Sequence, residues 1–348
     1  MNKFKFYFIL LITTVSLFSC SKDDNSTTVE PLRDYAVQYT TDNTDIEEYL
    51  NSNYITVVNH PDFADDQDVT IAKIDAGQPS IMSYLNATTY PKLLSREVSL
   101  HNIVYKLYYL VLRPGVGTSP YNVDGVLTAY RGDYLSRDAT TKALSATKFE
   151  EVKNPQSFFS LNSTIIGWSE IFPQFKTGIN SEHVDPNSGM KDGTIDHTNF
   201  GAGIMFLPSG LGYYNTGSNS IPSYSPLVFS FKLYEIQRLD QETTVFNGQI
   251  IASPDGIPSY LEDLNNDSYI YDYRNTTNYP TTPNDAIRYA DDTDKDGIPD
   301  YLDVDDDGDN YTTKLEIKNT ATGLPYPFAD IPTCTSGKKN YLDATCHP

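Results

Sequence analysis

The feature that most constrains the fold of this chain is an acidic run near its end, "DDTDKDGIPDYLDVDDDGDNYTTKLE", which extends from Asp291 to Glu316. Carboxylates recur along it mostly at steps of two or three residues. Like charges at this density repel one another in a compact structure unless hard cations lie between them. The residues that we expect to act as ligands are Asp292, Asp294, Asp296, Asp300, Asp303, Asp305, Asp307, Asp309 and Glu316.

The end of this run fits a twelve-residue calcium loop. Positions one, three, five, seven, nine and twelve are occupied by Asp305, Asp307, Asp309, Tyr311, Thr313 and Glu316. Position six is Asn310 instead of glycine, but asparagine tolerates a left-handed turn. The run also resembles thrombospondin type 3 calcium repeats. We therefore predict structural Ca²⁺ here; the alternative is a disordered acidic tail.

A weaker copy of the pattern lies upstream, because "DGIPSYLEDLNNDS" at 255–268 parallels "DGIPDYLDVDDDGD" at 296–309. This copy would form a poorer site or donate to the same array, through Asp255, Glu262, Asp263, Asn265 and Asp267. We interpret residues 239–317 as an acidic calcium-binding region that packs on or extends from the preceding domain.

The first residues have the pattern of a secretory signal. Lys3 and Lys5 precede an apolar run that ends at Phe18 and is too short to span a membrane comfortably. The small residue Ser19 followed by Cys20 resembles a bacterial lipobox, and the following "SKDDNSTT" resembles the surface-export signal of Bacteroidetes lipoproteins.

We therefore expect residues 1–19 to be removed and Cys20 to be lipidated, with residues 20–34 forming a polar tether. Ordinary cleavage near Ser19 with an unmodified cysteine is the alternative. The prediction places the protein at the outer membrane, on the periplasmic or the cell-surface face, and the export signal favours the surface.

Cysteine content and charge agree with an extracytoplasmic location. Besides Cys20, the chain has only Cys334 and Cys346, both in the C-terminal tail at 318–348. In an oxidising compartment we expect them to form a disulfide, with two free thiols as the alternative. The formal charge of −21 argues against nucleic acid as a partner, since no basic stripe is visible.

The central part of the chain predicts an α+β fold with an antiparallel sheet around a short helix. The 27 tyrosines favour β structure. Expected strands are 102–113, 124–132, "KFEEV", "SFFSL", "GIMFLP" and "PLVFSFKLYEI", and "WSEIFPQF" is expected to be a helix that Pro173 ends or kinks. In the N-terminal extension, 35–98, a Thr44–Glu47 capping box predicts a second short helix.

Residues 99–238 resemble an FKBP-type peptidyl-prolyl isomerase. The motifs that carry the resemblance are "RPGVGTSP", "DGVLTAYRG", "FSLNSTIIGWSEIFPQFKTG", "FLPSGLGYYNTGSNSIP" and "PLVFSFKLYEI", which occur in the family's order. The resemblance implies a sheet that curls around the helix, with Trp168, the only tryptophan, as the floor of an apolar pocket for a proline ring.

The same resemblance implies roles for further residues. The backbone N–H of Ile165, which follows Thr164, would bind a substrate carbonyl, and the Tyr213 hydroxyl would reach the ligand. Glu150 stands where the family has aspartate, and Phe158 is an alternative to Phe159. The complete implied set is Tyr130, Phe149, Glu150, Phe159, Thr164, Ile165, Trp168, Tyr213, Ile221 and Phe229.

An insertion at 179–199 separates the predicted helix from the next strand. It contains Glu182, His183, Asp185, Asp192, Asp196 and His197, which could coordinate a metal, although we favour a solvated loop because no ligand spacing is diagnostic. Elsewhere the chain has neither G-x-S-x-G nor H-E-x-x-H.

The sequence therefore predicts a membrane-anchored prolyl isomerase that acts on proline-containing polypeptides and assists the folding of exported or surface proteins. Two alternatives remain open. One is a non-catalytic module that binds proline-containing segments, which the Glu150 and Thr164 departures favour. The other is a calcium-binding protein in which the pocket has lost its use.

Overall fold

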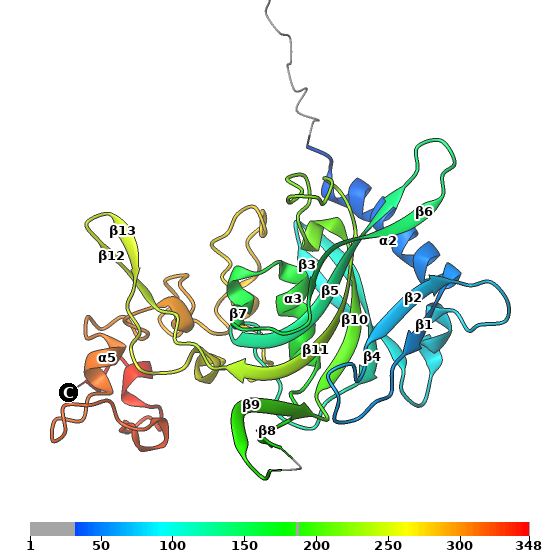
Figure 1. Cartoon of the computed structure of the whole chain (residues 1–348). Coiled ribbons are helices and arrows are strands. Elements are labelled where there is room, and N and C mark those ends of the chain that lie inside the picture. Colours follow the sequence, from blue (N-terminus) through cyan, green and yellow to red (C-terminus); the bar gives the residue numbers. More distant parts are fainter. Residues whose placement is uncertain (1–31, 186–187, 348) are drawn as a thin grey trace, which may run out of the picture. The chain divides into compact units, whose positions relative to one another are not determined.

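The computed structural model describes residues 32–185 and 188–347. Residues Asp34–Pro348 form one compact unit, built around a sheet of seven strands whose pairings are all antiparallel (Figure 1). The predicted signal segment and Cys20 lie outside the described residues. None of the helices in the described part of the chain has the length and apolar character needed to cross a membrane.

The main sheet has the strand order β3-β4-β10-β11-β5-β6, and β7 pairs with β5 beside this path. Its members are β3 (Lys92–Leu100), β4 (Ile103–Arg113), β5 (Gly125–Arg137), β6 (Leu144–Val152), β7 (Phe159–Ser160), β10 (Gly201–Leu207) and β11 (Leu227–Gln237). The short helix α3 (Ile166–Ile171) packs against the sheet and continues into a 3₁₀ turn at Phe172–Gln174, as the position of Pro173 predicted. The predicted α+β class, with an antiparallel sheet curled around a short helix, is confirmed.

Both faces of the sheet centre are buried, and alternate residues of each strand point to different cores. In β4, Leu107 and Tyr109 belong to the core around Trp168, whereas Tyr108 and Leu110 belong to a second core that contains Ile46 and Leu50. All seven residues of β10 are buried for the same reason. The sheet therefore needs a cover on each face.

The N-terminal extension provides the second cover. Helix α2 (Tyr35–Ser52) supplies Ile46, Tyr49 and Leu50 to the second core, and β3 adds a strand to the sheet edge. The helix begins at Tyr35, with Asp34 as the N-cap, so the predicted capping box is wrong. Thr44 lies in the helix interior, where its hydroxyl donates to the Thr40 carbonyl at 2.8 Å.

Three two-stranded hairpins complete the β structure: β1 (Asn53–Val57) with β2 (Val69–Lys73), β8 (Ile179–Val184) with β9 (Lys191–Thr198), and β12 (Thr243–Phe246) with β13 (Gln249–Ala252). The second hairpin is the insertion for which we expected a solvated loop. That expectation is wrong in its conformation, because an antiparallel ladder joins Ile179 to Thr198, but right in its solvent exposure.

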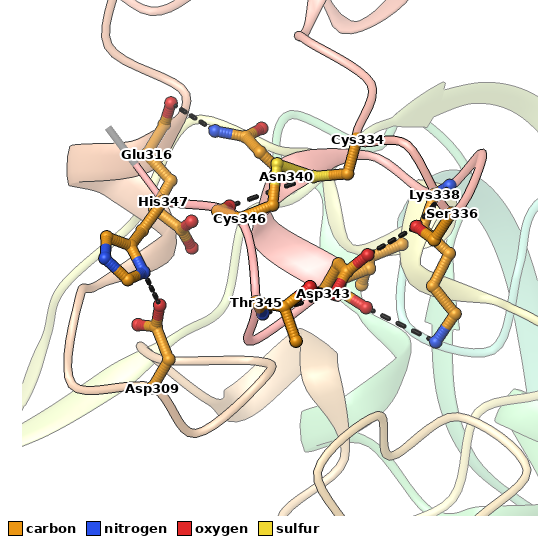
Figure 2. The surroundings of a disulfide bond; sticks show 11 residues. Asp309, Glu316, Cys334, Ser336, Lys338, Asn340, Asp343, Thr345, Cys346 and His347 are labelled. Atoms are coloured by element: carbon orange, nitrogen blue, oxygen red, sulfur yellow. Dashed lines mark hydrogen bonds and ion pairs between the residues drawn. A yellow bond between two sulfur atoms is a disulfide. The ribbon is translucent and has the colours of Figure 1, made fainter.

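Beyond the β12–β13 hairpin the described chain has only short elements. They are α4 (Asp285–Arg288), α5 (Thr313–Glu316) and the 3₁₀ turns η5 (Ser259–Glu262), η6 (Asp300–Leu302), η7 (Phe328–Asp330) and η8 (Asn340–Leu342). A small core of Ile257, Ile317, Ile331 and Tyr341 holds this region together. A disulfide joins Cys334 to Cys346, beside the pair formed by His347 and Asp309 (Figure 2).

The C-terminal region also packs on helix α3. The Glu170 carboxylate, only 2% exposed, accepts from Arg96 Nε at 2.8 Å and from the Tyr271 hydroxyl at 3.0 Å. The Arg96 guanidinium lies 3.6 Å from the Tyr269 ring centroid, and the Tyr269 hydroxyl donates to the Glu170 carbonyl at 2.9 Å. The strand β3, the helix and the C-terminal region therefore meet at one buried ion pair.

Removing the cation of this pair should destabilise the fold. Arg96→Met keeps most of the side-chain stem but leaves Glu170 buried without a counter-charge, and we expect a loss of about 3–5 kcal/mol in the free energy of unfolding. Arg131→Met is the control, because Arg131 is 47% exposed in its pair with Asp133, and such pairs contribute about 1 kcal/mol or less. Urea denaturation measures both; equal losses would contradict the central role of Glu170.

Candidate functional site

A pocket of about 520 Å³ opens between the concave face of the sheet and helix α3. Its walls come from β5, β6, β7, the turn before α3, the loop at Gly212–Tyr213 and β11. The lining residues are Tyr130, Phe149, Glu150, Phe159, Ser163, Thr164, Ile165, Ile166, Trp168, Gly212, Tyr213 and Phe229.

Trp168 is the floor of this pocket and the centre of its aromatic packing. Trp168 is 5% exposed, and three other lining rings meet the indole edge to face, with centroids at 5.0 Å for Tyr130, 5.6 Å for Phe159 and 5.4 Å for Phe229. Phe149 extends the wall through an edge contact with Phe229 at 5.6 Å. Edge-to-face packing of this kind fixes each ring in orientation, so the pocket is preformed.

Two glycines allow the walls to approach this closely. A Cβ atom at Gly132 would lie 2.3 Å from the Phe149 ring, so only glycine leaves room for that ring over β5. A Cβ atom at Gly167 would lie 2.5 Å from Leu207, so glycine lets helix α3 lie against β10. The "YRG" and "IIGW" motifs therefore fix the position of the aromatic wall and of the floor.

The polar side chains of the pocket are Tyr130, Glu150, Ser163, Thr164 and Tyr213. Burial raises the pKa of Tyr130, and a hydrogen bond to the Glu150 carboxylate raises it further. Burial and the Glu150 charge also raise the pKa of Tyr213. Both hydroxyls therefore stay protonated near neutral pH and remain available as donors. In the described part of the chain, the N–H of the pocket residue Ile165 donates to no protein acceptor.

Nine of the ten residues that the FKBP resemblance implied line this pocket; Ile221 does not. It lies in the loop after Tyr213, as expected, but is buried in the core around Trp168. Phe159, and not its alternative Phe158, is the lining residue. Sequence reasoning missed Ser163, Ile166 and Gly212, which are direct neighbours of predicted residues.

Helix α2 supports one loop of the pocket through hydrogen bonds. The buried Asp42 carboxylate accepts from the Ser209 N–H at 2.7 Å, from the Ser209 hydroxyl at 2.6 Å and from Gln38 Nε2 at 2.6 Å. Ser209 begins the 3₁₀ turn η4 (Ser209–Leu211), which leads directly into Gly212 and Tyr213. The N-terminal extension is therefore part of the support of the pocket.

Acidic groups form a second kind of candidate site, in the C-terminal region. Two groups of three lie within the predicted run, Asp292 with Asp294 and Asp296, and Asp305 with Asp307 and Asp309; in each group the candidate ligand atoms lie within 4.8 Å of one another. Groups of this geometry could hold ions.

Details of the second group match the twelve-residue loop. Asn310, at position six, has a φ of 74° and therefore adopts the left-handed conformation that the position requires. Glu316, at position twelve, is buried, and neither carboxylate oxygen has a hydrogen-bond partner among the described residues.

Besides Glu316, two predicted ligands lie outside both groups. The Asp300 carboxylate accepts from the N–H and hydroxyl of Thr293, each at 2.8 Å, and Asp303 accepts from the N–H groups of Val304 and Asp305. These carboxylates have a structural partner already. Among the candidate ligands of the insertion, His183 Nδ1 lies 3.0 Å from Asp196 Oδ2. None of the groups of three possible metal ligands found in the described residues lies in the insertion.

Two further acidic groups were not predicted as such: Asp240 with Glu242 and Asp255, and Asp255 with Glu262 and Asp306. Asp255 and Glu262 belong to the weaker upstream copy, but Asp240 and Glu242 lie outside both acidic motifs and Asp306 was not among the expected ligands.

Comparisons with known proteins match two parts of the chain. A family model described as the C-terminal domain of BamM matches residues 253–341, about a quarter of the chain. No curated protein sequence matches.

Several solved structures of FKBP-type isomerases are similar at low identity. A peptidyl-prolyl cis-trans isomerase from Pseudomonas syringae is 16% identical, and the match covers 58% of this chain and 95% of that one with a TM-score of 0.31. FkpA from Escherichia coli is 22% identical over 38% of this chain and 48% of that one, with a TM-score of 0.27. The N-terminal domain of FKBP42 from Arabidopsis thaliana is 13% identical over 38% and 86%, with a TM-score of 0.26. At these values nothing about activity follows from the likeness.

The Asp42 support should give the fold a measurable pH dependence. Burial raises the pKa of Asp42 to about 6 from 3.8, against the hydrogen bonds from Ser209 and Gln38. Between these pH values the folded state binds the Asp42 proton more tightly than the unfolded chain, so this contribution is present at low pH and is lost as the pH rises through about 6. The expected decrease is up to about 3 kcal/mol.

The measurement compares the wild type with Asp42→Asn. The difference in their free energies of unfolding should fall by about that amount between pH 4 and pH 7, and urea denaturation at each pH follows it. Asp75→Asn, an exposed aspartate, should leave a difference that does not change with pH. A flat profile for Asp42→Asn would show that this carboxylate titrates normally.

Proposed function

We propose that the protein is a peptidyl-prolyl cis-trans isomerase and that its substrates are proline-containing segments of other polypeptides. The observation that supports this most directly is Trp168 as the floor of a preformed aromatic pocket. Aromatic rings pack around this floor, and among the described residues the backbone N–H of Ile165 has no protein acceptor.

This arrangement suits the chemistry of an X-Pro bond. Rotation has a barrier of about 18–20 kcal/mol because amide resonance must be lost, and no nucleophile or metal takes part. An apolar pocket disfavours the planar, charge-separated amide relative to the twisted transition state. The proline ring would lie on Trp168, the Ile165 N–H would hold a substrate carbonyl, and the Tyr213 hydroxyl would donate to the ligand.

Glu150 would take the place of the family's aspartate as the acceptor that orients a neighbouring hydroxyl. Glu150 lines the pocket together with Tyr130 and Tyr213 and contributes to the raised pKa of both hydroxyls, which supports this role. The remaining candidate is a module that binds proline segments without catalysis, and the open pocket fits that function equally well.

Two further parts of the proposal concern location and metal. We infer that the chain is lipidated at Cys20 and held at the outer membrane, with the cell surface favoured. We also infer structural Ca²⁺ in the acidic run, with Asp292, Asp294 and Asp296 as one ligand set and Asp305, Asp307, Asp309 and Glu316 as another. The buried, unpartnered Glu316 carboxylate and the left-handed Asn310 support the second set.

Two neighbouring phenylalanines test the pocket. Phe159 lines the pocket and packs on Trp168, whereas Phe158 is 36% exposed and does not line it. Phe159→Ala should lower kcat/KM for isomerisation of an X-Pro peptide by at least about tenfold, which corresponds to ~1.4 kcal/mol of transition-state stabilisation. Phe158→Ala should change it less than about twofold.

The assay is line-shape or exchange NMR on a proline-containing peptide, which reports binding and exchange separately. Saturable peptide binding with no acceleration of exchange by the folded, calcium-loaded wild type would replace the isomerase proposal with the binding module. Equal effects of the two substitutions would place the activity outside this pocket.

A further inference from the structure

A buried cluster of carboxylates lies where the main sheet ends and the C-terminal region begins. It combines the two unpredicted groups that share Asp255, namely Asp240, Glu242, Asp255, Glu262 and Asp306. Four of the five side chains are almost fully buried: Glu242 is 0% exposed, Glu262 and Asp306 are 1% exposed and Asp255 is 2% exposed. These residues come from three separated segments of the chain, so the cluster exists only in the folded protein.

Three of the carboxylates accept a backbone hydrogen bond through one oxygen, whereas the other oxygens of the cluster have no partner among the described residues. The backbone N–H of Ile257 donates to Asp255 Oδ1 at 2.6 Å, that of Asp255 to Glu242 Oε2 at 3.3 Å and that of Gly256 to Asp240 Oδ2 at 3.0 Å. Within the described residues, seven buried oxygens have no hydrogen-bond partner: Asp240 Oδ1, Glu242 Oε1, Asp255 Oδ2, both oxygens of Glu262 and both of Asp306.

The described residues supply no counter-charge for the cluster. No lysine or arginine in residues 32–185 and 188–347 forms an ion pair with any of the five carboxylates. The nearby Lys314 instead donates to the Pro254 carbonyl at 2.8 Å. Buried carboxylates are expected to be paired, protonated or bound to a metal, and one metal ion would give partners to several of these oxygens at once.

We propose that this cluster is a calcium site, centred on Asp255 and distinct from the two ligand groups predicted in the acidic run. All of its donors are oxygens, the ligand type that Ca²⁺ prefers, and each of the two groups that share Asp255 brings three candidate ligand atoms within 4.8 Å of one another. Mg²⁺ retains several waters in most sites and suits a closed, all-protein cage poorly. Zinc favours nitrogen and sulfur donors, and the cluster offers neither.

The site is placed to fix the junction between the two parts of the chain. Asp240 and Glu242 flank Gln241, whose side chain accepts from Asn162 Nδ2 at 2.9 Å and donates to the Val123 carbonyl. Asn162 lies in the 3₁₀ turn η2 (Leu161–Ser163), directly before the pocket residues Thr164 and Ile165. Glu262 ends the turn η5, and Asp306 lies between Asp305 and Asp307 of the acidic run. One ion would therefore join all three segments.

The first test counts calcium ions on the purified full-length chain. Isothermal titration calorimetry with CaCl₂, after removal of metal by chelation, should show at least one ion fewer for Glu262→Gln/Asp306→Asn than for the wild type. The matched control is Asp294→Asn/Asp296→Asn, in an exposed group of the acidic run. It should retain the buried site, so a variant that combines all four substitutions should bind fewer ions than either double variant.

A second measurement keeps the test independent of whether the buried variant folds. The variant Asp292→Asn/Asp294→Asn/Asp305→Asn/Asp307→Asn removes ligands of the acidic run and leaves the buried cluster intact, and it should still bind calcium. Absence of calcium binding by this folded variant would overturn the proposal, as would equal stoichiometry for the wild type and Glu262→Gln/Asp306→Asn.

Thermal unfolding adds a prediction about which protein has the higher Tm with and without calcium. In excess chelator, Glu262→Gln/Asp306→Asn should have a higher Tm than the wild type, because two buried acidic groups are gone. In excess Ca²⁺ the order should reverse, because the wild type gains from binding at one more site than the variant. A variant that is less stable by the same amount in both conditions would indicate a purely structural role for these carboxylates and would overturn the proposal.

Discussion

The Glu170 carboxylate is the group on which the arrangement of this protein depends most. Helix α3 has only six residues, and a helix of this length has no stability of its own in water. Its place is set by what Glu170 contacts: Arg96 from the sheet edge and Tyr271 from the C-terminal region. Since Trp168 is two residues away on the same helix, the position of the pocket floor is fixed by a charge buried on the other side of that helix. The isomerase-like sheet and the C-terminal region therefore depend on each other structurally, although their sequences differ so much in composition.

The sheet gives the pocket its walls because it is covered on both faces. Helix α3 and the aromatic core occupy the concave face, and helix α2 with its own core occupies the other. The second cover does more than exclude water from Leu110 and Phe206. The Asp42 carboxylate of helix α2 accepts hydrogen bonds from Ser209, which begins the turn that leads to Tyr213. The pocket residue Tyr213 is therefore positioned by a helix that precedes the sheet in the chain.

How much of this could be predicted from the sequence follows from the range of the interactions. The alternation in 102–113 and the apolar pattern around Trp168 are local, and such patterns predicted the strands and the helix. Most of the pocket lining was implied by the resemblance to the FKBP family. The start of helix α2 was missed because "YAVQYTTDNT" has a weak apolar pattern and its cap, Asp34, lies ten residues before the more obvious signal at Thr44. The β8–β9 hairpin was missed because its residues are almost all polar and exposed. The cluster at Asp255 was missed for a different reason: Asp240 and Glu242 look like ordinary surface acids until the fold brings Glu262 and Asp306 beside them.

Gln241 gives the two candidate sites a shared part. It lies between two ligands of the proposed calcium site and holds the turn that enters the pocket, so an ion on one side and a peptide on the other would act on the same few backbone atoms. Coupling between two binding equilibria is reciprocal. Whatever factor calcium contributes to the capture of a proline segment, the proline segment must contribute to the retention of calcium. A client polypeptide would then be, in thermodynamic terms, an effector of the metal site, and the occupancy of that site would report how much client is bound.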